Sequence, residues 1–493
     1  MADSGRRRAV VVGGGVGGLS AGILLAEGGY DTTIVEQHDV LGGYQQGFVR
    51  RGVSFEVGHH YIGGCLPGEA FARYLRLLGI YDDLQPLPAR DDAVFRIVLP
   101  DGTRADLPRG MDRLAAELKR AHPREAEGID ALLGKIEECV DASPWHGMKR
   151  RQPVYEIHEK YSSVSARDVI ESHVSSPALR ETLSSFCFST TMFPDQCPFA
   201  IYAHIFHLLV SSVSRMRGGG RSLVEAMERR FRSLGGAVIL GRGAERLVTE
   251  NRLGRSLILA DGTELNFDIA LFTCHPFEAV RVCGRENFSP VFLENLDSME
   301  QGRGSFKAYV ETDGPVASLG GDHCMIMSAD RRWAPGVYIS SPSASDPSRG
   351  GHTVEILCWQ DFEEVERWVN SKPGGRPKEY LEFKERRARE LLGLADREFP
   401  GIIRSVRHVW TSTPLTNLRY TRSVRGAAMG VSHSIAFQGR RQMRPRNRLR
   451  NVFFGGQSVG LPGVAGTIIT SAAICNVLLD GADLLGRILE MRD

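Results

Sequence analysis

The first fifty residues show the clearest pattern of apolar and polar positions in the chain. Residues 9–12 are a continuous apolar run, followed by "GGGVGGLSAGILLAEGG" and then by "TTIVE". A short apolar run bounded by glycines predicts a buried strand, and the longer apolar segment predicts a helix. We therefore expect a strand–helix–strand unit, followed by a hairpin in "GFVRRGVSFEVGHHYIG", where apolar and polar residues alternate.

The rest of the chain divides into blocks with different patterns. Residues 110–213 have a mostly helical pattern and end in the apolar "PFAIYAHIFHLLV". Residues 221–247 predict an amphipathic helix, a Gly-Gly turn and a strand. Residues 257–276 predict a hairpin around Asp261-Gly262 and a further strand. The block 451–481 predicts a strand, a glycine-rich loop and a helix.

The glycine turn of the N-terminal unit has the spacing of a dinucleotide-binding motif. Gly13, Gly15 and Gly18 form G-x-G-x-x-G between the first strand and the helix. The first glycine permits the tight turn, the second lets the backbone approach a pyrophosphate, and the third packs helix against strand. Glu36 ends the second strand, where its carboxylate accepts hydrogen bonds from ribose hydroxyls. Together these features predict a bound dinucleotide.

The segments beyond Glu36 favour FAD over NAD. Gly42 and Gly43 let backbone pass close to an extended cofactor, and Gly455, Gly456 and "LPGVAGT" offer backbone amides at a helix start for the flavin end. The alternative is that these glycines only form turns. We find no second strand-GxGxxG-helix unit for NAD(P)H. The predicted cofactor contacts are Gly13, Gly15, Val16, Gly17, Gly18, Glu36, Gln37, Gly42, Gly43, Tyr44, Gly456, Gln457, Gly463, Val464 and Ala465.

Nucleotide-binding segments thus occur at the start, middle and end of the chain. The predicted fold class is α/β: a Rossmann-type, glutathione reductase-like FAD-binding domain assembled from discontinuous segments, with an α+β substrate domain. We assign residues 9–105, 216–285 and 436–490 to the FAD-binding domain. Residues 106–215 form the helical part of the substrate domain, and 286–435 its sheet.

Composition and charge narrow the class of protein. Hydrophobic residues make up 42% and charged residues 24%, as in a soluble globular protein. A net charge of +2 argues against nucleic-acid binding. The nine cysteines are scattered with no Cys-x-x-Cys spacing, which predicts reduced thiols in a cytoplasmic protein and neither a zinc site nor a redox dithiol. We expect no signal peptide and no transmembrane helix, because glycines and Pro462 interrupt the apolar stretches.

Five segments resemble the phytoene desaturase, carotenoid isomerase and retinol saturase group of flavoproteins, which includes related polyene-modifying enzymes of natural-product pathways. Residues 10–48 resemble the group's N-terminal FAD signature, and "FEVGHHYIGG" is similar to a segment of the retinol saturase branch. The central segment 216–241 and the C-terminal segments 413–430 and 449–473 follow in family order. Residues 290–400 are too divergent to align by eye.

The resemblance implies FAD as the sole organic cofactor and a lipophilic, polyunsaturated substrate. It also implies that Val238 lies beside the adenine. Reactions in the group include desaturation, saturation, cis–trans isomerisation and carbocycle formation in polyene tetramate macrolactam pathways, and the resemblance does not choose between them. Gln457 and Ser458 replace a longer glycine-rich stretch, and Leu41 replaces a basic or small residue. These departures leave the substrate open.

The polar candidates for catalysis follow the predicted hairpin. They are Glu56, His59, His60 and Tyr61. A base near the flavin assists removal of hydrogen from a carbon–carbon bond, and histidine is the one among these that titrates near neutrality, so His60 is the leading candidate for substrate contact. The alternative for Glu56 is a carboxylate that caps backbone amides.

Two further groups of residues have competing interpretations. His204, His207 and Leu208 share one helical face, but with no third ligand evident we expect a core helix or the wall of a lipophilic tunnel rather than a metal site. The same apolar helix could alternatively touch a membrane surface. A basic segment is interpreted as a solvated loop, with docking to anionic lipid or an acidic carrier as alternatives. It contains Arg440, Arg441, Arg444, Arg446, Arg448 and Arg450.

We therefore expect an FAD-dependent oxidoreductase that desaturates or saturates carbon–carbon bonds of a conjugated polyene. One alternative is redox-neutral isomerisation or reductive cyclisation of a polyene. Amine oxidation would require an aromatic cage beside the flavin, and a non-catalytic FAD-binding scaffold would lack polar groups near it. The expected partner is a lipophilic small molecule, with no nucleic acid; peripheral membrane association and the oligomeric state stay open.

Overall fold

The computed structural model describes residues 5–58, 60–320, 323–328, 330 and 332–491. Its first layer is a five-stranded parallel sheet in the order β10-β2-β1-β14-β20. The strands come from the start, middle and end of the chain: β1 (Arg8–Val12), β2 (Asp31–Val35), β10 (Ala237–Ile239), β14 (Ile269–Phe272) and β20 (Val452–Phe454). The expected strand–helix–strand unit is confirmed, with α1 (Val16–Glu27) between β1 and β2.

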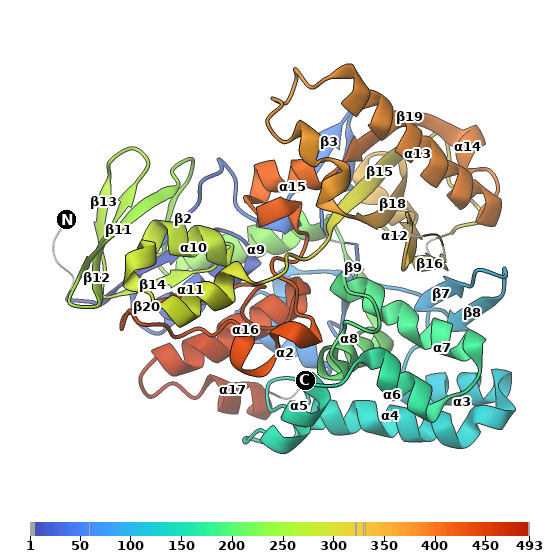
Figure 1. Ribbon diagram of the computed structural model, residues 1–493, viewed down its shortest axis with the longest axis horizontal. Coiled ribbons are helices and arrows are strands. Elements are labelled where there is room, and N and C mark those ends of the chain that lie inside the picture. The colour runs from blue at the N-terminus through green and yellow to red at the C-terminus, as the bar shows by residue number, and fades with distance from the viewer. Residues whose placement is uncertain (1–4, 59, 321–322, 329, 331, 492–493) are drawn as a thin grey trace.

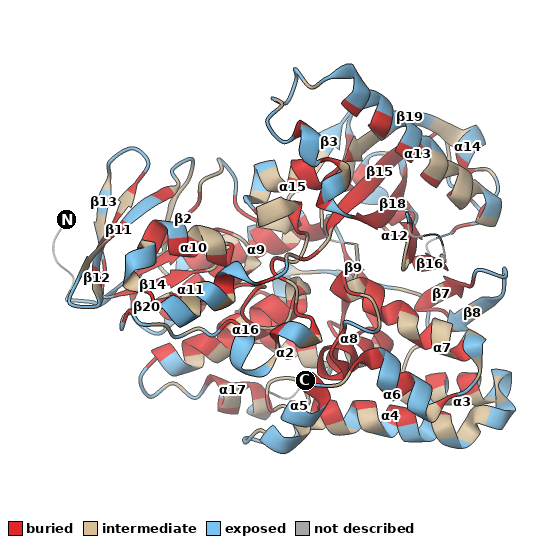
Figure 2. Cartoon of the chain, in the orientation of Figure 1, coloured by how far each residue is buried: buried red, intermediate tan, exposed pale blue. Residues whose placement is uncertain are grey.

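Helices cover this sheet, and two of them are apolar on nearly all sides. α1 is buried from Gly17 to Leu25 and packs against α9 (Gly219–Ser233) and α16 (Gly463–Leu478). A helix that is apolar all round belongs inside a protein rather than on its surface. Figure 2 shows α16 largely in the colour of buried residues. Around the layer lie α2 (Ala70–Leu77), α10 (Pro276–Cys283), α11 (Pro290–Asp297) and α17 (Leu484–Glu490).

Both sequence-predicted hairpins are present. β3 (Gly47–Arg50) pairs antiparallel with β4 (Val53–Glu56). The hairpin around Asp261-Gly262 joins β12 (Leu253–Leu259) to β13 (Glu264–Asn266), and β11 (Ala244–Glu250) completes a three-stranded sheet. A second small sheet, β5-β9-β6, connects the layers of the molecule. Its strands are β5 (Ile62–Gly63), β6 (Pro86–Pro88) and β9 (Val213–Met216).

The second large layer is a mixed seven-stranded sheet in the order β19-β15-β18-β17-β16-β7-β8. Figure 1 shows it at the opposite side of the molecule from the parallel sheet, covered by α13 (Lys378–Glu398) and α14 (Ile402–Ser405). Its strands are β7 (Phe95–Val98), β8 (Arg104–Leu107), β15 (Gly304–Thr312), β16 (His323–Met327), β17 (Gly336–Ser340), β18 (His352–Gln360) and β19 (Val406–Ser412). In the sequence, α12 (Pro342–Ser345) lies between β17 and β18, and α15 (Pro414–Thr421) follows β19.

The expected boundaries at residues 105 and 286 differ from this topology. β7 and β8 pair with each other, and β7 pairs with β16, so this hairpin belongs to the seven-stranded sheet. Leu296 of α11, beyond residue 286, packs in the core around the parallel sheet. Both differences have one cause. They depend on contacts between segments far apart in the chain, and local hydrophobic periodicity does not reveal such contacts.

The helical part forms a block of its own beside the seven-stranded sheet. α8 packs against α4, α5 and α6, and Figure 1 shows this block in green and cyan. Its helices are α3 (Met111–Ala121), α4 (Ala126–Asp141), α5 (Tyr155–Ser162), α6 (Ala166–His173), α7 (Pro177–Ser184) and α8 (Phe199–Ser211). In the part of the chain that the structure describes, no helix has the length and apolarity needed to cross a bilayer.

Candidate cofactor and substrate site

One cavity of about 380 Å³ lies where the parallel sheet, the helical part and the seven-stranded sheet meet. Both the expected cofactor-binding segments and the polar residues after the first hairpin reach it. The sequence-predicted residues that line it are Gly13, Gly15, Val16, Gly17, Glu36, Gln37, Gly42, Gly43, Tyr44, His60, Tyr61, Gly456, Gln457, Gly463, Val464 and Ala465.

The glycines of the N-terminal turn have the geometry that the motif predicts. Gly13 has a φ of +109°, which favours glycine. A Cβ on Gly18 would lie 1.9 Å from the carbonyl oxygen of Gly13, so this position requires close packing of helix on strand. A Cβ on Gly15 would meet nothing within 4 Å, because Gly15 faces the cavity. Backbone there is open to a phosphate at the start of α1.

Glu36 follows β2 and lines the cavity with a fixed carboxylate. Its Oε2 accepts a hydrogen bond from the Gly14 amide at 2.7 Å, and its Oε1 accepts one from the His38 amide at 2.9 Å. These bonds fix the carboxylate at the end of β2. Each carboxylate oxygen can accept a further hydrogen bond, and the residue lines the cavity.

The glycines beyond Glu36 and those near the C-terminus border the same space. Gly42 donates from its amide to the carbonyl of Gly14 at 2.8 Å, which brings the 42–45 turn against the glycine motif. Gly463 begins α16 with a φ of +81°, and a Cβ there would meet nothing within 4 Å. This end of the cavity therefore combines exposed backbone, the starts of two helices and one carboxylate. These features fit an extended dinucleotide such as FAD, held by the motif, Glu36, the 42–44 turn and residues 456–465.

Two expected contacts lie outside the lining of this cavity. Gly18 is behind the turn, where it packs against Gly13. Val238 pairs with Ile34 in the edge strand β10, and the chain reaches the cavity only afterwards, at Gly243 and Ala244. Val238 is not among the residues that line this cavity, and its place beside the adenine stays a prediction.

β15 and β18 form one wall of the cavity. Side chains alternate between the two faces of this strand pair, and every second residue faces the cavity. Ser305 lies opposite Trp359 and Lys307 lies opposite Leu357, and all four line the cavity. Residues between them, such as Phe306, point to the other face and pack in the core under α13. Opposite residues of an antiparallel pair share a face, so Lys307 is the single cation of this pair of strands at the cavity.

Lys307, His60 and Glu355 form a hydrogen-bonded chain at this wall. The Nζ of Lys307 lies 3.1 Å from Nε2 of His60 and also donates to the carbonyl of Val57. The Nδ1 of His60 lies 3.2 Å from Oε2 of Glu355. Burial and the nearby Lys307 lower the pKa of His60 to about 4, and burial lowers the pKa of Lys307 to about 8. At neutral pH His60 is therefore uncharged, donates from Nδ1 to Glu355 and accepts from Lys307 at Nε2.

Glu355 fixes the orientation of His60 from outside the cavity lining. Burial raises the pKa of its carboxyl, but the hydrogen bond from His60 and the charge of Arg349 outweigh burial and leave that pKa below its ordinary value. Its Oε1 also accepts from the backbone amide of Glu56 at 3.1 Å. The ionised carboxylate keeps His60 in the tautomer that faces Lys307.

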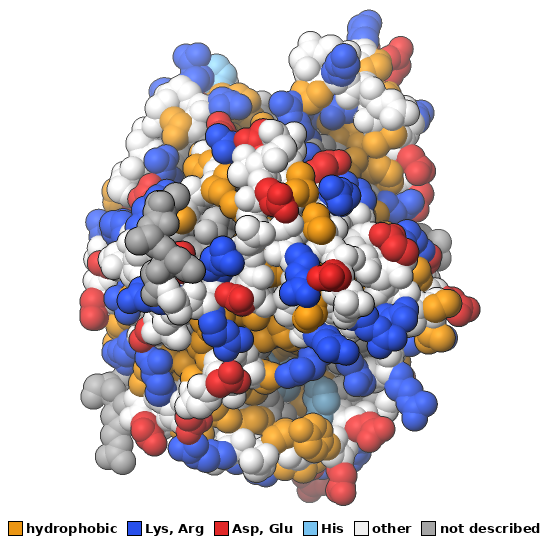
Figure 3. Space-filling model, turned by 90° about the vertical axis from the view of Figure 1, so that its left-hand side faces the viewer, with side chains coloured by type: hydrophobic (Ala, Val, Ile, Leu, Met, Phe, Trp, Pro, Cys, Tyr) orange, Lys and Arg blue, Asp and Glu red, His pale blue; other side chains and the backbone are white. Residues whose placement is uncertain are grey.

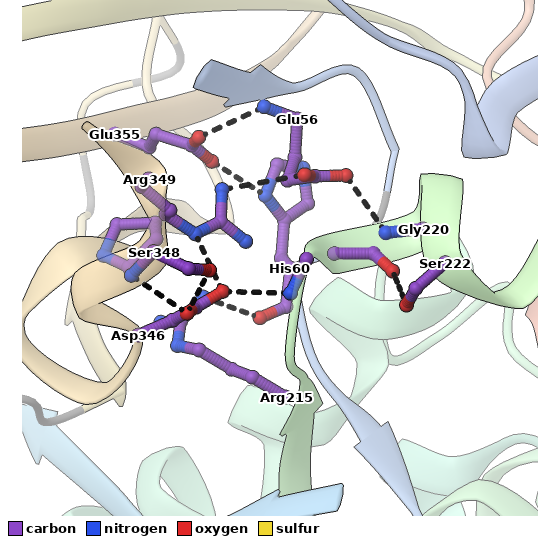
Figure 4. Close-up of polar contacts among 12 residues, drawn as sticks. Glu56, His60, Arg215, Gly220, Ser222, Asp346, Ser348, Arg349 and Glu355 are labelled. Atoms are coloured by element: carbon purple, nitrogen blue, oxygen red, sulfur yellow. Dashed lines mark hydrogen bonds and ion pairs between the residues drawn. The ribbon is translucent and has the colours of Figure 1, made fainter. Parts of the chain in front are cut away.

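Glu56 caps backbone instead of facing the cavity. Its carboxylate accepts from the amide of Gly220 at 3.0 Å and pairs with Arg349 at 3.3 Å, as Figure 4 shows. Burial, opposed by Arg349, raises the pKa of Glu56 to about 7. Because Glu56 is not among the residues that line the cavity, the expectation of direct catalysis is corrected in favour of the capping alternative. His59 lies outside the described residues.

The other members of this cluster anchor the loop that carries His60. Arg215 of β9 donates to the carbonyl of His60 at 2.8 Å. Asp346 accepts from the amide of Gly218 at 2.8 Å and lies 3.6 Å from the guanidinium of Arg349. Figure 4 shows these side chains converging from β9, the start of α9 and the segment before β18. Four functional candidates of this cluster were not predicted from the sequence: Lys307, Glu355, Arg215 and Arg349.

Tyr61 and the helix α8 complete the substrate side of the cavity. The hydroxyl of Tyr61 hydrogen-bonds to Ser189 at 2.7 Å, and burial raises the pKa of Tyr61. His204, His207 and Leu208 line the cavity, as the tunnel-wall interpretation expects. Across the described part of the chain, no three His, Cys, Asp or Glu side chains come together as a metal site.

Negative charge is confined to one end of the cavity. Among the described residues that line it, the only acids are Glu36 and Glu278, and Glu278 pairs with Arg281 and Arg422. Leu357 lies opposite Lys307 on this wall, and Trp359, two residues further along the strand, contacts the ring of Phe188. The outer surface differs: basic and acidic side chains are interspersed on the face in Figure 3, without a one-signed field of the kind that binds nucleic acid.

Comparison with known proteins agrees with this geometry. The model of the family described as flavin containing amine oxidoreductase matches residues 16–475. The chain belongs to this family. Membership makes it a flavin-dependent oxidoreductase and implies FAD as the flavin, and it confirms the resemblance drawn from the motifs.

Relatives of known name lie in the branch that the motifs indicated. An all-trans-retinol 13,14-reductase of Danio rerio is 25% identical over 98% of this chain and 86% of its own length. An all-trans-zeta-carotene desaturase of Myxococcus xanthus is 26% identical over 95% and 92%. A putrescine oxidase triple mutant superposes with a TM-score of 0.71 at 12% identity, covering 97% of this chain and 99% of its own, which shows the shared fold.

Proposed function

We propose that this chain adds or removes hydrogen across a carbon–carbon bond of a lipophilic conjugated polyene. The observation that carries the proposal is the substrate end of the cavity, where Lys307 and neutral His60 stand in an apolar and aromatic wall without a carboxylate in the lining. An uncharged hydrocarbon chain fits this lining, because burial of apolar surface drives its binding. The names of the retinol reductase and carotene desaturase relatives support the same substrate class.

FAD, when bound, supplies hydride transfer to or from carbon. Lys307 is the group that handles the accompanying proton. Its pKa of about 8 lets it act as an ammonium that gives a proton or as an amine that takes one near neutral pH. His60 orients the Nζ through its Nε2, and Glu355 fixes the His60 tautomer. The apolar wall around them excludes water from the reacting carbon.

Redox-neutral isomerisation or cyclisation of a polyene is the second candidate, since it uses the same apolar cavity and the same proton-handling residue. Amine oxidation has less support. A substrate ammonium would meet Lys307 and find a lining acid only at Glu36 or Glu278, which lie at the nucleotide end. The rings of Tyr61 and Tyr338 line the cavity 5.3 Å apart, but a cation between them would still lack a carboxylate partner.

The test is anaerobic incubation of the flavin-loaded protein with polyenes and, separately, with amines. We expect polyenes to change the flavin absorbance. A product lighter by two hydrogens identifies desaturation, and one heavier by two, formed from the reduced flavin, identifies saturation. Unchanged mass with a shifted polyene spectrum identifies isomerisation. Flavin bleaching by amines alone would overturn the proposal.

A further inference from the structure

A second cavity adjoins the first on the side of the helical part. It has a volume of about 560 Å³ and lies between α5, α8, α16 and residues 438–446. The two cavities share five lining residues, which are Trp145, His146, His204, Leu461 and Ile469. At its outer side lie the exposed Arg444 and Arg446 and Val477, which is 56% exposed, so this cavity reaches the surface. A long chain that enters from the surface would thus reach the wall that separates this cavity from the one lined by Lys307.

The shared wall contains a histidine with an unused acceptor. Nδ1 of His204 lies 2.5 Å from the carbonyl oxygen of Ala200. A carbonyl only accepts, so Nδ1 carries the proton and Nε2 is left as an acceptor. Burial lowers the pKa of His204 to about 4, which keeps the ring neutral. Nε2 is buried and has no hydrogen-bond partner among the described residues.

Two more buried polar atoms of the same cavity lack partners. His146 faces His204 with ring centroids 4.2 Å apart and planes at 79°, and its Nε2 is also unpaired. The hydroxyl of Ser162 is the third such atom. The surrounding wall is aliphatic, with side chains such as Ile201 and Ile474. Buried polar groups are normally hydrogen-bonded, and a substrate that carries a donor can pair with the acceptor of His204.

We propose that the substrate carries a hydrogen-bond donor, a hydroxyl or an amide N–H, which pairs with Nε2 of His204 where the chain passes between the cavities. The inference rests on the proposed function and narrows the substrate to polar-substituted polyenes. His146 lies in the segment 142–154 between α4 and α5, outside any helix, whereas His204 is held by α8. The His146 ring, whose Nδ1 lies 2.7 Å from the Ser143 hydroxyl, has to turn aside for the donor to reach Nε2 of His204.

The test compares three probes of equal chain length: a C20 polyene alcohol, its methyl ether and the parent hydrocarbon. The ether keeps the oxygen but lacks the donor. Binding to the flavin-loaded protein is followed by quenching of tryptophan fluorescence, because Trp145 lies in the shared wall. We expect the alcohol to bind about tenfold more tightly than the ether, the effect of one hydrogen bond to a buried acceptor.

Substitutions in the wall shared by the two cavities show whether His204 causes the preference for the alcohol. His204→Phe should abolish the preference for the alcohol, and His204→Gln, which retains an acceptor, should keep part of it. His158→Phe is the matched control, since His158 lines the same cavity from the exposed side of α5. Flavin content and thermal midpoint identify any variant that has not folded, and in that case the His204→Gln comparison decides.

Equal affinity of the wild-type protein for alcohol and ether would overturn this inference and would indicate that water pairs with His204. An alcohol preference that survives His204→Phe would also overturn it. Failure of the proposed function looks different: none of the three probes would bind or change the flavin spectrum. If the hydrocarbon binds and reacts as well as the alcohol, the proposed function stands and this inference fails.

Discussion

Replacement of Lys307 by methionine is the sharpest test of the proposed chemistry. Methionine is one atom shorter than lysine and keeps an unbranched apolar side chain, but it removes the ammonium that lines the cavity and bonds to His60. A positioned acid or base contributes about 10² to 10⁴ in rate. We therefore expect flavin reduction or oxidation by the polyene to slow at least about 10²-fold, while flavin binding is retained.

The pH dependence of the reaction rate gives a second quantitative test of the role of Lys307. With a pKa of about 8, roughly a tenth of the side chain is neutral at pH 7 and roughly nine tenths at pH 9. Desaturation, in which Lys307 takes a proton, should accelerate about tenfold over this interval, and saturation, in which it gives one, should slow about tenfold. His60, with its pKa of about 4, does not titrate in this range.

The assay is anaerobic stopped-flow absorbance of the flavin at a series of pH values. Lys384→Met is the matched control, because Lys384 lies on α13 and does not line the cavity. Glu56 titrates at about 7 behind the cavity, so Glu56→Gln shows whether it contributes to the profile. A pH-dependent limb near 8 that persists in Lys307→Met would refute the assignment, as would a rate within about threefold of the wild-type rate.

Three further predictions concern the cofactor and the cluster behind His60. Glu36→Gln should weaken FAD binding about tenfold or more, since it removes a charge-assisted acceptor; titration of the apoprotein measures this, and unchanged affinity would contradict the ribose assignment. Gly18→Ala should prevent stable FAD binding, because its Cβ would lie 1.9 Å from the Gly13 carbonyl, and a yellow, folded variant would show that the turn adapts. Arg349→Met should lower the free energy of unfolding by about 3–5 kcal/mol, because it leaves buried Glu56 and its neighbours without their cation. Denaturant titration measures this loss. Glu56→Gln in the same chain should partly restore the stability.

The parts of the site that hold the cofactor could be predicted because their signals are local. The glycine turn, Glu36 and the 42–44 turn lie within one short segment, where a required backbone geometry selects a residue type. The hairpins were equally clear from alternation and turn residues. The expected domain boundary at residue 105 failed because β7 finds its partner β16 more than 200 residues later.

The proton-handling residues could not be placed from sequence, although a signal exists. Lys307 and Glu355 are buried charged residues within the mostly apolar strands "GSFKAYVET" and "HTVEILCWQ". A charge in such a strand is costly to bury unless paired, which marks both positions as unusual. What brings them together is the register: Glu355 lies opposite Tyr309, two residues from Lys307 on the same face. That register is a property of the sheet and not of either strand.

The charge of Lys307 also bears on which substrates this cavity accepts. At about 4 Å and an effective dielectric constant near 20, two like charges repel by about 4 kcal/mol, which lowers affinity by roughly 10³-fold. An ammonium substrate would carry this penalty at the substrate end of the cavity, since Glu355 is shielded behind His60 and already accepts its hydrogen bond. A polyene carries none of it. The positive wall of this cavity is thus consistent with the proposed uncharged polyene and disfavours an amine.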